Sequence, residues 1–343
     1  MISGDRLDNP AEAIGGYFGL DLPDFGEPYP QAIRYQSARA AIRAVLECNG
    51  IRRAWIPAYV CDSVLCAAQQ AGVEVCSYML DDALYPHQLP ETLADGEVVL
   101  YVNYFGLCQS AVIRLQTQFP AEQLIIDNSH AMFAPHSGVL ATVYSPRKFA
   151  GLPDGGLLLH SPTLRIIAPV TEDMGSFERM KFLLLRAACS AREGYAAFNE
   201  ARNSLNGLPP LAMSRLTQRL MRSIDWQQAR VRRHDNFAIM THMLGDLNRL
   251  HWAPTDDDVP LCYPLALQGV DVAAIKTSLA AQDIFTATYW PDAMSRIRPG
   301  SIEATLVHDT LFLPVDQRLD VAQAEMAARC VLELLHHGSR KKD

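Results

Sequence analysis

The sequence has no long hydrophobic run and no cluster of basic residues. Hydrophobic residues make up 49% of the 343 positions, yet no apolar stretch approaches the ~20 residues that a membrane-spanning helix requires. Even the segment FLLLRAACSA is interrupted by Arg186. The formal net charge is −8 and the pI is near 5.7, which is opposite to the electrostatic pattern of a nucleic-acid-binding protein. We therefore expect a soluble protein with neither a membrane nor a nucleic acid as a partner.

Paired cysteines and a secretion signal are also missing. None of the eight cysteines belongs to a CxxC pair, and the first residues, MISGDRLDNP, lack the basic and then apolar pattern of a signal peptide. We therefore expect reduced thiols and a cytoplasmic location. Four potential metal ligands follow no common zinc spacing, so no metal site is predicted; they are Asp127, His130, His136 and His160.

From Tyr35 to about Leu164, short apolar runs alternate with helical segments. The runs with the length and composition of strands include RRAWIPAYV, VEVCSYML, EVVLYVNYFG, QLIIDNS, VLATVYS and GGLLLHS. Their alternation with helices is typical of βαβ units, whose strands form a mainly parallel sheet. The sequence therefore predicts an α/β fold with a large domain, in which helices flank a mainly parallel central sheet.

The second half of the chain has a different pattern. After about Leu164 the sequence becomes helical, as in RLTQRLMRSIDWQQARVRRHDNFAIMTHML, and shorter strand and helix signals follow toward the C-terminus. This indicates a smaller α+β domain at the C-terminal end. We place an N-terminal arm and the large domain in residues 1–240, and the small domain in residues 241–343.

The first predicted helix offers a place for an anion. In open α/β sheets, ligands bind where strands end and helices begin, since helix N-termini carry free backbone N–H groups. Ser37 stands at the N-cap position of the segment ARAAIRAVLECNG, and Gly50 ends it. Ser37 and Ala38 are small enough to let the backbone approach an anion, and Arg39 adds positive charge. The same pattern also fits a capped surface helix without a ligand.

Asp127 and Lys148 follow two successive apolar runs. Asp127 ends the run QLIID, so its carboxylate is expected at the buried edge of a crevice, where it needs a partner such as a protonated ring nitrogen. A turn or helix-capping acid is the alternative. Lys148 follows VLATVYS and precedes GLPDGG, whose Gly and Pro residues prevent a helix. It is either a surface loop residue or an amine held in a site, where burial lowers its pKa and makes it nucleophilic.

Together these three features match what pyridoxal phosphate (PLP) requires of a protein. The helix N-terminus would take the phosphate, the acid would pair with the pyridinium nitrogen, and the lysine would form a Schiff base with the aldehyde. The combination favours a PLP enzyme over the three separate alternatives, which are a capped surface helix, a turn or helix-capping acid and a surface loop lysine.

The same segments resemble the sugar aminotransferases of the DegT/DnrJ family, which are fold type I PLP enzymes. The resemblance covers about residues 30 to 160 and rests on SARAAI, IPAYVCDSVLCAAQQAGVEV, VNYFG, IIDNSHA and YSPRKFAGLPDGG, in that order. It implies PLP as the cofactor, Lys148 as the Schiff-base lysine and Asp127 as the partner of the pyridine nitrogen. His130 takes the place of the His or Gln near the cofactor's ring oxygen.

The resemblance also implies the rest of the cofactor site, and it shows where this chain departs from the family. The family usually has an aromatic residue over the cofactor ring, and here that place falls on Cys61, with Tyr59 nearby. The family commonly has Gly and Thr where this chain has Ala38 and Arg39. The acid and the lysine are 148 − 127 = 21 positions apart, which is shorter than expected of the family. The phosphate cup is assigned to Ser37, Ala38, Arg39 and Ser145.

The function implied by the resemblance is transfer of an amino group from glutamate to a nucleotide-linked keto sugar. A different PLP reaction, such as that of a lyase, is one alternative, and a catalytically retired binding or regulatory protein is another. The resemblance further implies a homodimer with the cofactor near the subunit boundary, to which residues 199–236 are expected to contribute. Tyr289, Trp290 and Arg318 are expected to face the substrate, although core packing explains the two aromatic residues equally well.

Overall fold

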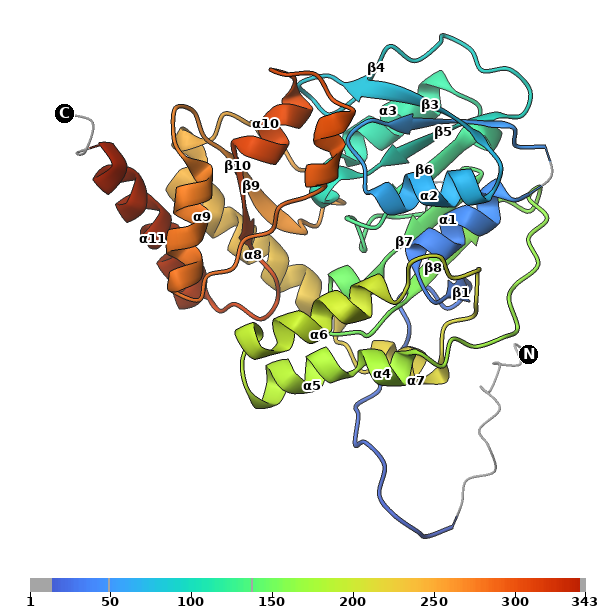
Figure 1. The fold of residues 1–343 in the computed structure, drawn as a ribbon, viewed down its shortest axis with the longest axis horizontal. Coiled ribbons are helices and arrows are strands. Elements are labelled where there is room, and N and C mark those ends of the chain that lie inside the picture. Colours follow the sequence, from blue (N-terminus) through green and yellow to red (C-terminus); the bar gives the residue numbers. More distant parts are fainter. Residues whose placement is uncertain (1–13, 49, 137, 340–343) are drawn as a thin grey trace.

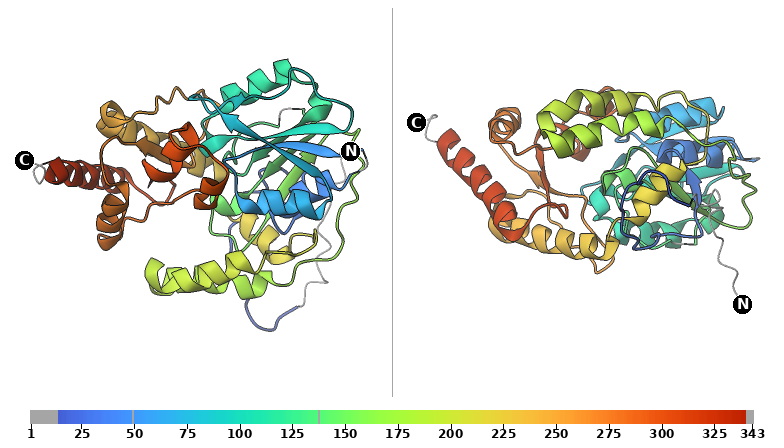
Figure 2. Two further views of the ribbon diagram at one scale, coloured as in Figure 1. Left: turned by 45° about the horizontal axis from the view of Figure 1, so that its top comes forward. Right: turned by 90° about the horizontal axis from the view of Figure 1, so that it is seen from below.

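The computed structural model describes residues 14–48, 50–136 and 138–339. The predicted N-terminal arm and the leading MISGDRLDNP segment therefore lie partly or wholly outside the described residues. Within them the chain forms a large sheet of eight strands and a small sheet of two. Figures 1 and 2 show the small sheet and its helices beside one end of the large sheet. In these ranges no helix is both long enough and apolar enough to cross a bilayer.

The large sheet has its parallel strands at the centre. Its order is β1-β8-β7-β6-β5-β2-β3-β4, and every neighbouring pair from β7 to β3 is parallel. The outer strands β8, β1 and β4 pair antiparallel. This confirms the predicted mainly parallel sheet. The strands are β1 (Ile33–Tyr35), β2 (Arg53–Pro57), β3 (Glu74–Leu80), β4 (Pro86–His87), β5 (Glu97–Val102), β6 (Leu124–Asn128), β7 (Ala141–Tyr144) and β8 (Gly156–His160).

Three helices connect the first strands of the large sheet: α1 (Ala38–Leu46), α2 (Asp62–Gln70) and α3 (Gln109–Gln118). The strands β6 and β7 are buried at every position, as expected of interior strands that are covered on both faces. The predicted cap of α1 is confirmed, because the Ser37 hydroxyl accepts the N–H of Ala40 at 3.2 Å. The helix ends at Leu46, and Gly50 has a φ of 101° in the turn before β2.

Four helices follow β8 and lie below the sheet in Figure 1. They are α4 (Ser176–Arg179), α5 (Lys181–Ala188), α6 (Ala191–Asn203) and α7 (Arg215–Arg222). Helices α5 and α6 pack side by side, yet α5 buries none of its residues although its sequence is KFLLLRAA. The helical segment predicted over residues 215–244 is in fact two helices, because Asp225 accepts the N–H of Gln228 at 2.8 Å and so starts a new one.

The C-terminal part is a small α+β unit, as the sequence predicted. It contains the antiparallel pair β9 (Cys262–Ala266) and β10 (Thr310–Pro314). Helix α8 packs against α11 and β9, and it contains position 240, where we place the end of the large domain; that boundary stays a prediction. The helices are α8 (Trp226–Leu244), α9 (Val272–Ala281), α10 (Ile302–His308) and α11 (Val321–Ser339).

Candidate active site

Asp127 and Lys148 lie at the carboxyl ends of two neighbouring parallel strands. Asp127 is in β6, and its partner in the parallel register with β7 is Val143. Ser145 follows β7, and a single 3-10 turn, η3 (Pro146–Lys148), then leads to Lys148. The structure therefore brings to one edge of the sheet the acid and the lysine that the sequence analysis singled out.

Desolvation shifts the pKa of both groups toward their neutral forms. It raises the pKa of Asp127, although hydrogen bonding from Ser129, whose N–H donates to Oδ1 at 2.9 Å, and the charge of Lys148 act in the opposite direction. It lowers the pKa of Lys148, against the attraction of Asp127. A lysine with a lowered pKa is a neutral amine for a larger fraction of the time near pH 7, and the neutral amine is the nucleophile.

The Lys148 side chain is exposed even though desolvation is the largest influence on its pKa. Exposure means that solvent or a ligand reaches the side chain, whereas desolvation means that protein surrounds it at depth. Both hold where protein atoms surround a side chain on most sides while part of its surface stays accessible. An amine in such a place can meet a ligand that is itself partly shielded from water.

His130 is fully buried and has one ring nitrogen without a partner. Its Nδ1 lies 3.5 Å from the backbone N–H of Phe105, whereas its Nε2 has no hydrogen-bond partner. Desolvation, followed by the positive charge of Lys148, holds the pKa of His130 well below its usual value, so the ring is neutral near pH 7. A buried polar atom without a partner costs free energy. Nε2 is therefore a group that a ligand could satisfy.

The start of α1 lies against the start of β8. The N–H of Gly155 donates to the carbonyl of Gln36 at 2.8 Å, and Ser37 forms an isolated bridge with Gly155. A Cβ atom on Gly156 would stand 2.2 Å from the backbone carbon of Ser37, so only glycine fits there. The Gly-Gly pair that follows Lys148 in the chain thus holds the helix N-terminus at the same end of the sheet as the lysine.

Two arginines add positive charge near this helix N-terminus. The Arg39 Nη1 donates to the carbonyl of Leu205 at 3.3 Å and to the side chain of Asn206, while its Nε is buried without an acceptor. Desolvation lowers the pKa of Arg147 to about 10, with repulsion from Arg39 as the next cause. No ion pair of Arg147 is found in the described part of the chain. The sequence analysis did not single out Arg147. Its position directly before Lys148 is the signal that could have identified it.

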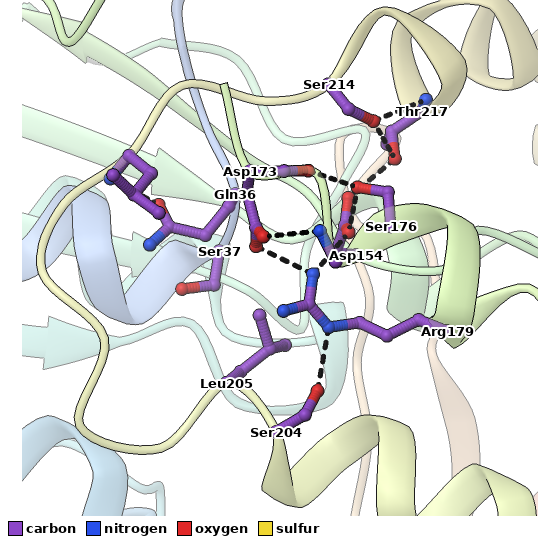
Figure 3. Close-up of polar contacts among 12 residues, drawn as sticks. Gln36, Ser37, Asp154, Asp173, Ser176, Arg179, Ser204, Leu205, Ser214 and Thr217 are labelled. Carbon is purple, nitrogen blue, oxygen red and sulfur yellow. Dashed lines mark hydrogen bonds and ion pairs between the residues drawn. The ribbon is translucent and has the colours of Figure 1, made fainter. Parts of the chain in front are cut away.

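A buried network ties this region to the helices below the sheet (Figure 3). Asp154 is fully buried and accepts hydrogen bonds from the hydroxyl groups of Ser176 and Thr217. It also forms an ion pair with Arg179 at 2.9 Å. Arg179 also pairs with Asp173 at 2.7 Å, and its Nε donates to the hydroxyl of Ser204 at 2.8 Å. Because Ser204 directly precedes the residues that bind Arg39, the network fixes the position of that guanidinium.

The other predicted cofactor contacts stand after β2 and β7 and at the starts of α1 and α2. Tyr59 is buried, and its ring contacts those of Tyr104 and Trp290, so it is part of an aromatic cluster. Cys61 precedes α2 and accepts a hydrogen bond from the Ser63 hydroxyl at 3.1 Å. Ser145 is buried at the start of η3, and Ala38 begins α1.

The candidates near the end of the chain separate into two groups. Tyr289 and Trp290 come from the small unit and pack against His130, at 4.9 Å between ring centroids in each case. Arg318 instead pairs with Asp316 at 2.7 Å and is exposed. Among the residues that the structure describes, no group of three or more Asp, Glu, His and Cys side chains could hold a metal ion.

Neither a protein-family model nor a curated protein matches the sequence. Several solved structures resemble this one. A DegT DnrJ EryC1 StrS aminotransferase from Brucella abortus is 13% identical, with a TM-score of 0.58 over 88% of this chain and 85% of its own. DesV of S. venezuelae, in complex with a ketimine intermediate, is 16% identical, with a TM-score of 0.60 over 88% and 84%. DesI, in the presence of its TDP-sugar product, is 15% identical, with a TM-score of 0.62 over 91% and 83%.

At these identities the likeness concerns the fold. The chain has the α/β fold of the DegT/DnrJ sugar aminotransferases, a mostly parallel sheet flanked by helices with a second, smaller sheet. The predicted fold class is confirmed.

Proposed function

We propose that this chain is a PLP-dependent aminotransferase, in which Lys148 carries the cofactor and an amino group passes from glutamate to a nucleotide-linked keto sugar. One observation carries the proposal. A buried carboxylate, that of Asp127, and a lysine of lowered pKa, Lys148, lie at the carboxyl ends of adjacent central strands. The fold is that of sugar aminotransferases, and ligands of open α/β sheets bind at this edge.

The residues at this edge of the sheet fit PLP in three separate places. The Asp127 carboxylate accepts hydrogen bonds from Ser129, and it would pair with the ring nitrogen. The unpartnered Nε2 of His130 would bond to the ring hydroxyl. The helix N-terminus after Ser37 and the charges of Arg39 and Arg147 would hold the phosphate, because guanidinium groups and free backbone N–H groups bind phosphate well.

Each residue then has a definite task. PLP, when bound, supplies an electron sink for the substrate carbon. Asp127 keeps the ring nitrogen protonated, since a carboxylate stabilises a nearby positive charge. The Lys148 amine would hold the cofactor and, as a base of lowered pKa, would move a proton at the substrate carbon near neutral pH. His130 stays neutral, so it does not compete for that proton.

The proposed substrate class and assembly follow from the fold and from an exposed apolar surface. The DesI structure was analysed in the presence of its TDP-sugar product, and we propose a nucleotide-linked sugar for this chain because it shares that fold. We propose a homodimer because α5 buries none of its residues, and because Leu184 and Tyr195 on α5 and α6 are 61% and 63% exposed. Contiguous apolar side chains on a surface mark an interaction site.

The test is to load the purified chain with PLP, add glutamate, and follow both cofactor absorbance and 2-oxoglutarate. An aminotransferase converts the cofactor to its amine form and releases one 2-oxoglutarate for each cofactor. A lyase would leave the cofactor as the aldehyde. A retired protein would give neither change. A screen of nucleotide-linked keto sugars against the amine-loaded protein would then identify the acceptor.

A further inference from the structure

Trp290 comes from the small unit, yet its ring lies among side chains of the large sheet. It stacks on His130 with 4.9 Å between ring centroids and 12° between planes. Tyr59 and Tyr104 meet it edge-on, at 4.8 Å and 5.9 Å. Aromatic pairs at these distances and angles attract each other beyond the burial of their surfaces. Trp290 is therefore held at a defined place beside the candidate active site.

The backbone of Trp290 has an unfavourable conformation. Its φ of 49° and ψ of 55° are in the left-handed region, which is costly for a bulky side chain. Such a conformation persists only where the surroundings enforce it, and it occurs preferentially at functional sites. The stacking of the indole ring on His130 is one such constraint. The unfavourable backbone conformation therefore indicates that the position of this side chain matters for the site.

Arg296 provides a second constraint. It follows the 3-10 turn η5 (Pro291–Ser295), which begins directly after Trp290. Its Nε donates to the carbonyl of Ala58 at 3.2 Å, its Nη2 to that of Val60 at 2.8 Å, and its Nη1 pairs with Asp62 at 2.6 Å. These three bonds attach the Trp290 segment to the residues on both sides of Cys61.

Trp290 stands next to the amine of Lys148 and has solvent-accessible surface left. The Nζ atom of Lys148 is 6.0 Å from the centroid of the Trp290 ring, and the Trp290 side chain is only partly buried. An aromatic ring bonded through one carbon to that nitrogen would come within stacking range of the indole, since stacked rings have centroids ~4.5–7 Å apart. Cys61, which is clamped nearby, has no ring to offer.

From these contacts we propose that Trp290 is the aromatic wall of the site and packs against the ring of the ligand that is bonded to Lys148. This inference rests on the proposed function, because it requires PLP or a similar aromatic aldehyde on that lysine. The small unit then contributes a direct ligand contact to a site otherwise built by the large sheet. Arg296 is a positioning residue that acts through Trp290.

The first measurement uses tryptophan fluorescence. The chain has four tryptophans, so replacing Trp55, Trp226 and Trp252 by Phe leaves Trp290 as the only one. When PLP is added, the emission of Trp290 should be strongly quenched, because a bound cofactor in contact with the indole accepts its excitation energy. The matched variant that keeps Trp252 instead should show weaker quenching. Equal or weaker quenching of Trp290 than of Trp252 would overturn the proposal.

The second measurement is PLP affinity in the full-length protein. Trp290→Ala should weaken PLP binding about tenfold, and Trp290→Phe less than about threefold, because Phe retains a ring that can stack. Trp252→Phe serves as the control and should change little. Tighter PLP binding by Trp290→Ala would show that the indole occupies the place of the ligand, which contradicts the proposal. Unchanged PLP binding would also overturn the proposal. Wild-type protein that takes up no PLP would instead overturn the proposed function, and the wall with it.

Discussion

The guanidinium groups of Arg39 and Arg147 are close enough for their charges to repel each other. After desolvation, this repulsion is the largest influence on the lowered pKa of Arg147. Arg39 uses one nitrogen on Leu205 and Asn206 and leaves its Nε buried without an acceptor. Two neighbouring cations that are partly withdrawn from water favour the binding of an anion between them, since an anion supplies the missing countercharge.

Replacing Arg147 should therefore affect the phosphate of the cofactor selectively. Arg147→Ala is expected to weaken PLP binding about 10- to 100-fold, because a hydrogen bond to a charged group contributes ~1.5–3 kcal/mol. Binding of pyridoxal, which lacks the phosphate, should change less than about threefold. Absorbance titration of both aldehydes checks this, with the exposed Arg298→Ala as a control. An equal loss for PLP and pyridoxal would mean that Arg147 does not bind the phosphate.

Replacing Lys148 should remove covalent attachment without unfolding the protein. Lys148→Ala deletes an exposed side chain, so its melting temperature should stay close to that of the wild type. Borohydride reduction should fix PLP to the wild-type chain on the peptide that contains Lys148, and to none of the peptides of the variant. The exposed Lys181→Ala is the control. Cofactor fixed to another peptide of the wild-type protein would refute the assignment of Lys148.

Replacing Asp127 by Asn should separate binding from catalysis. The variant keeps the shape of the side chain but loses the charge that holds the ring nitrogen protonated. We expect PLP to bind still, while the half-reaction with glutamate slows by a factor that corresponds to ~3–4 kcal/mol, as for other preorganised electrostatic contacts. Stopped-flow absorbance measures the rate. A rate near that of the wild type would exclude Asp127 from the mechanism.

The buried His130 should make the protein less stable in acid. Its pKa in the folded chain lies well below the ordinary value of 6.5, so below about pH 6.5 the unfolded chain binds a proton that the folded chain does not. Stability therefore falls as the pH drops below that value, by up to ~1.4 kcal/mol per pH unit. His130→Gln should reduce this slope. Denaturant unfolding at pH 7 and pH 5 compares the two proteins, and identical slopes would contradict the neutral buried state.

The central sheet could be predicted from sequence because its signals are local. Runs such as QLIID and VLATVY are mostly apolar, and the structure buries β6 and β7 throughout. The cap of α1 was equally local, since Ser37 bonds to a residue three positions away. Asp127 and Lys148 end successive runs, and parallel strands necessarily bring such ends to one edge of the sheet.

The parts that sequence analysis missed depend on contacts between distant positions. Asp154 meets Arg179 and Thr217 only because α4 and α7 fold back under β8. The stacking of Trp290 on His130 joins the small unit to the large sheet, and no periodic pattern encodes it. The break between α7 and α8 was missed because both helices lie in one run of residues with helical spacing. The start of α8 as a separate helix depends on the N-cap formed by Asp225.

The paired helices α5 and α6 present an apolar surface that the described residues leave uncovered. Leu184 is 61% and Tyr195 is 63% exposed, and Phe177 just before α5 is 55% exposed. Exposed apolar surface of this kind costs solubility unless a partner covers it. A second copy is the simplest partner, because isologous dimers are the commonest oligomers.

We therefore predict a homodimer whose interface includes α5 and α6. The double variant Leu184→Glu, Tyr195→Glu should sediment as a monomer at micromolar concentration, because two charges would be buried without partners at the interface. Val321→Glu, which changes an apolar residue that is 50% exposed on α11, should remain a dimer. If the dimer completes each site, the monomeric variant loses transaminase activity together with assembly. A wild-type monomer with full transaminase activity would show that each site is complete within one chain, and the expected contribution of residues 199–236 to a neighbouring site would then be wrong.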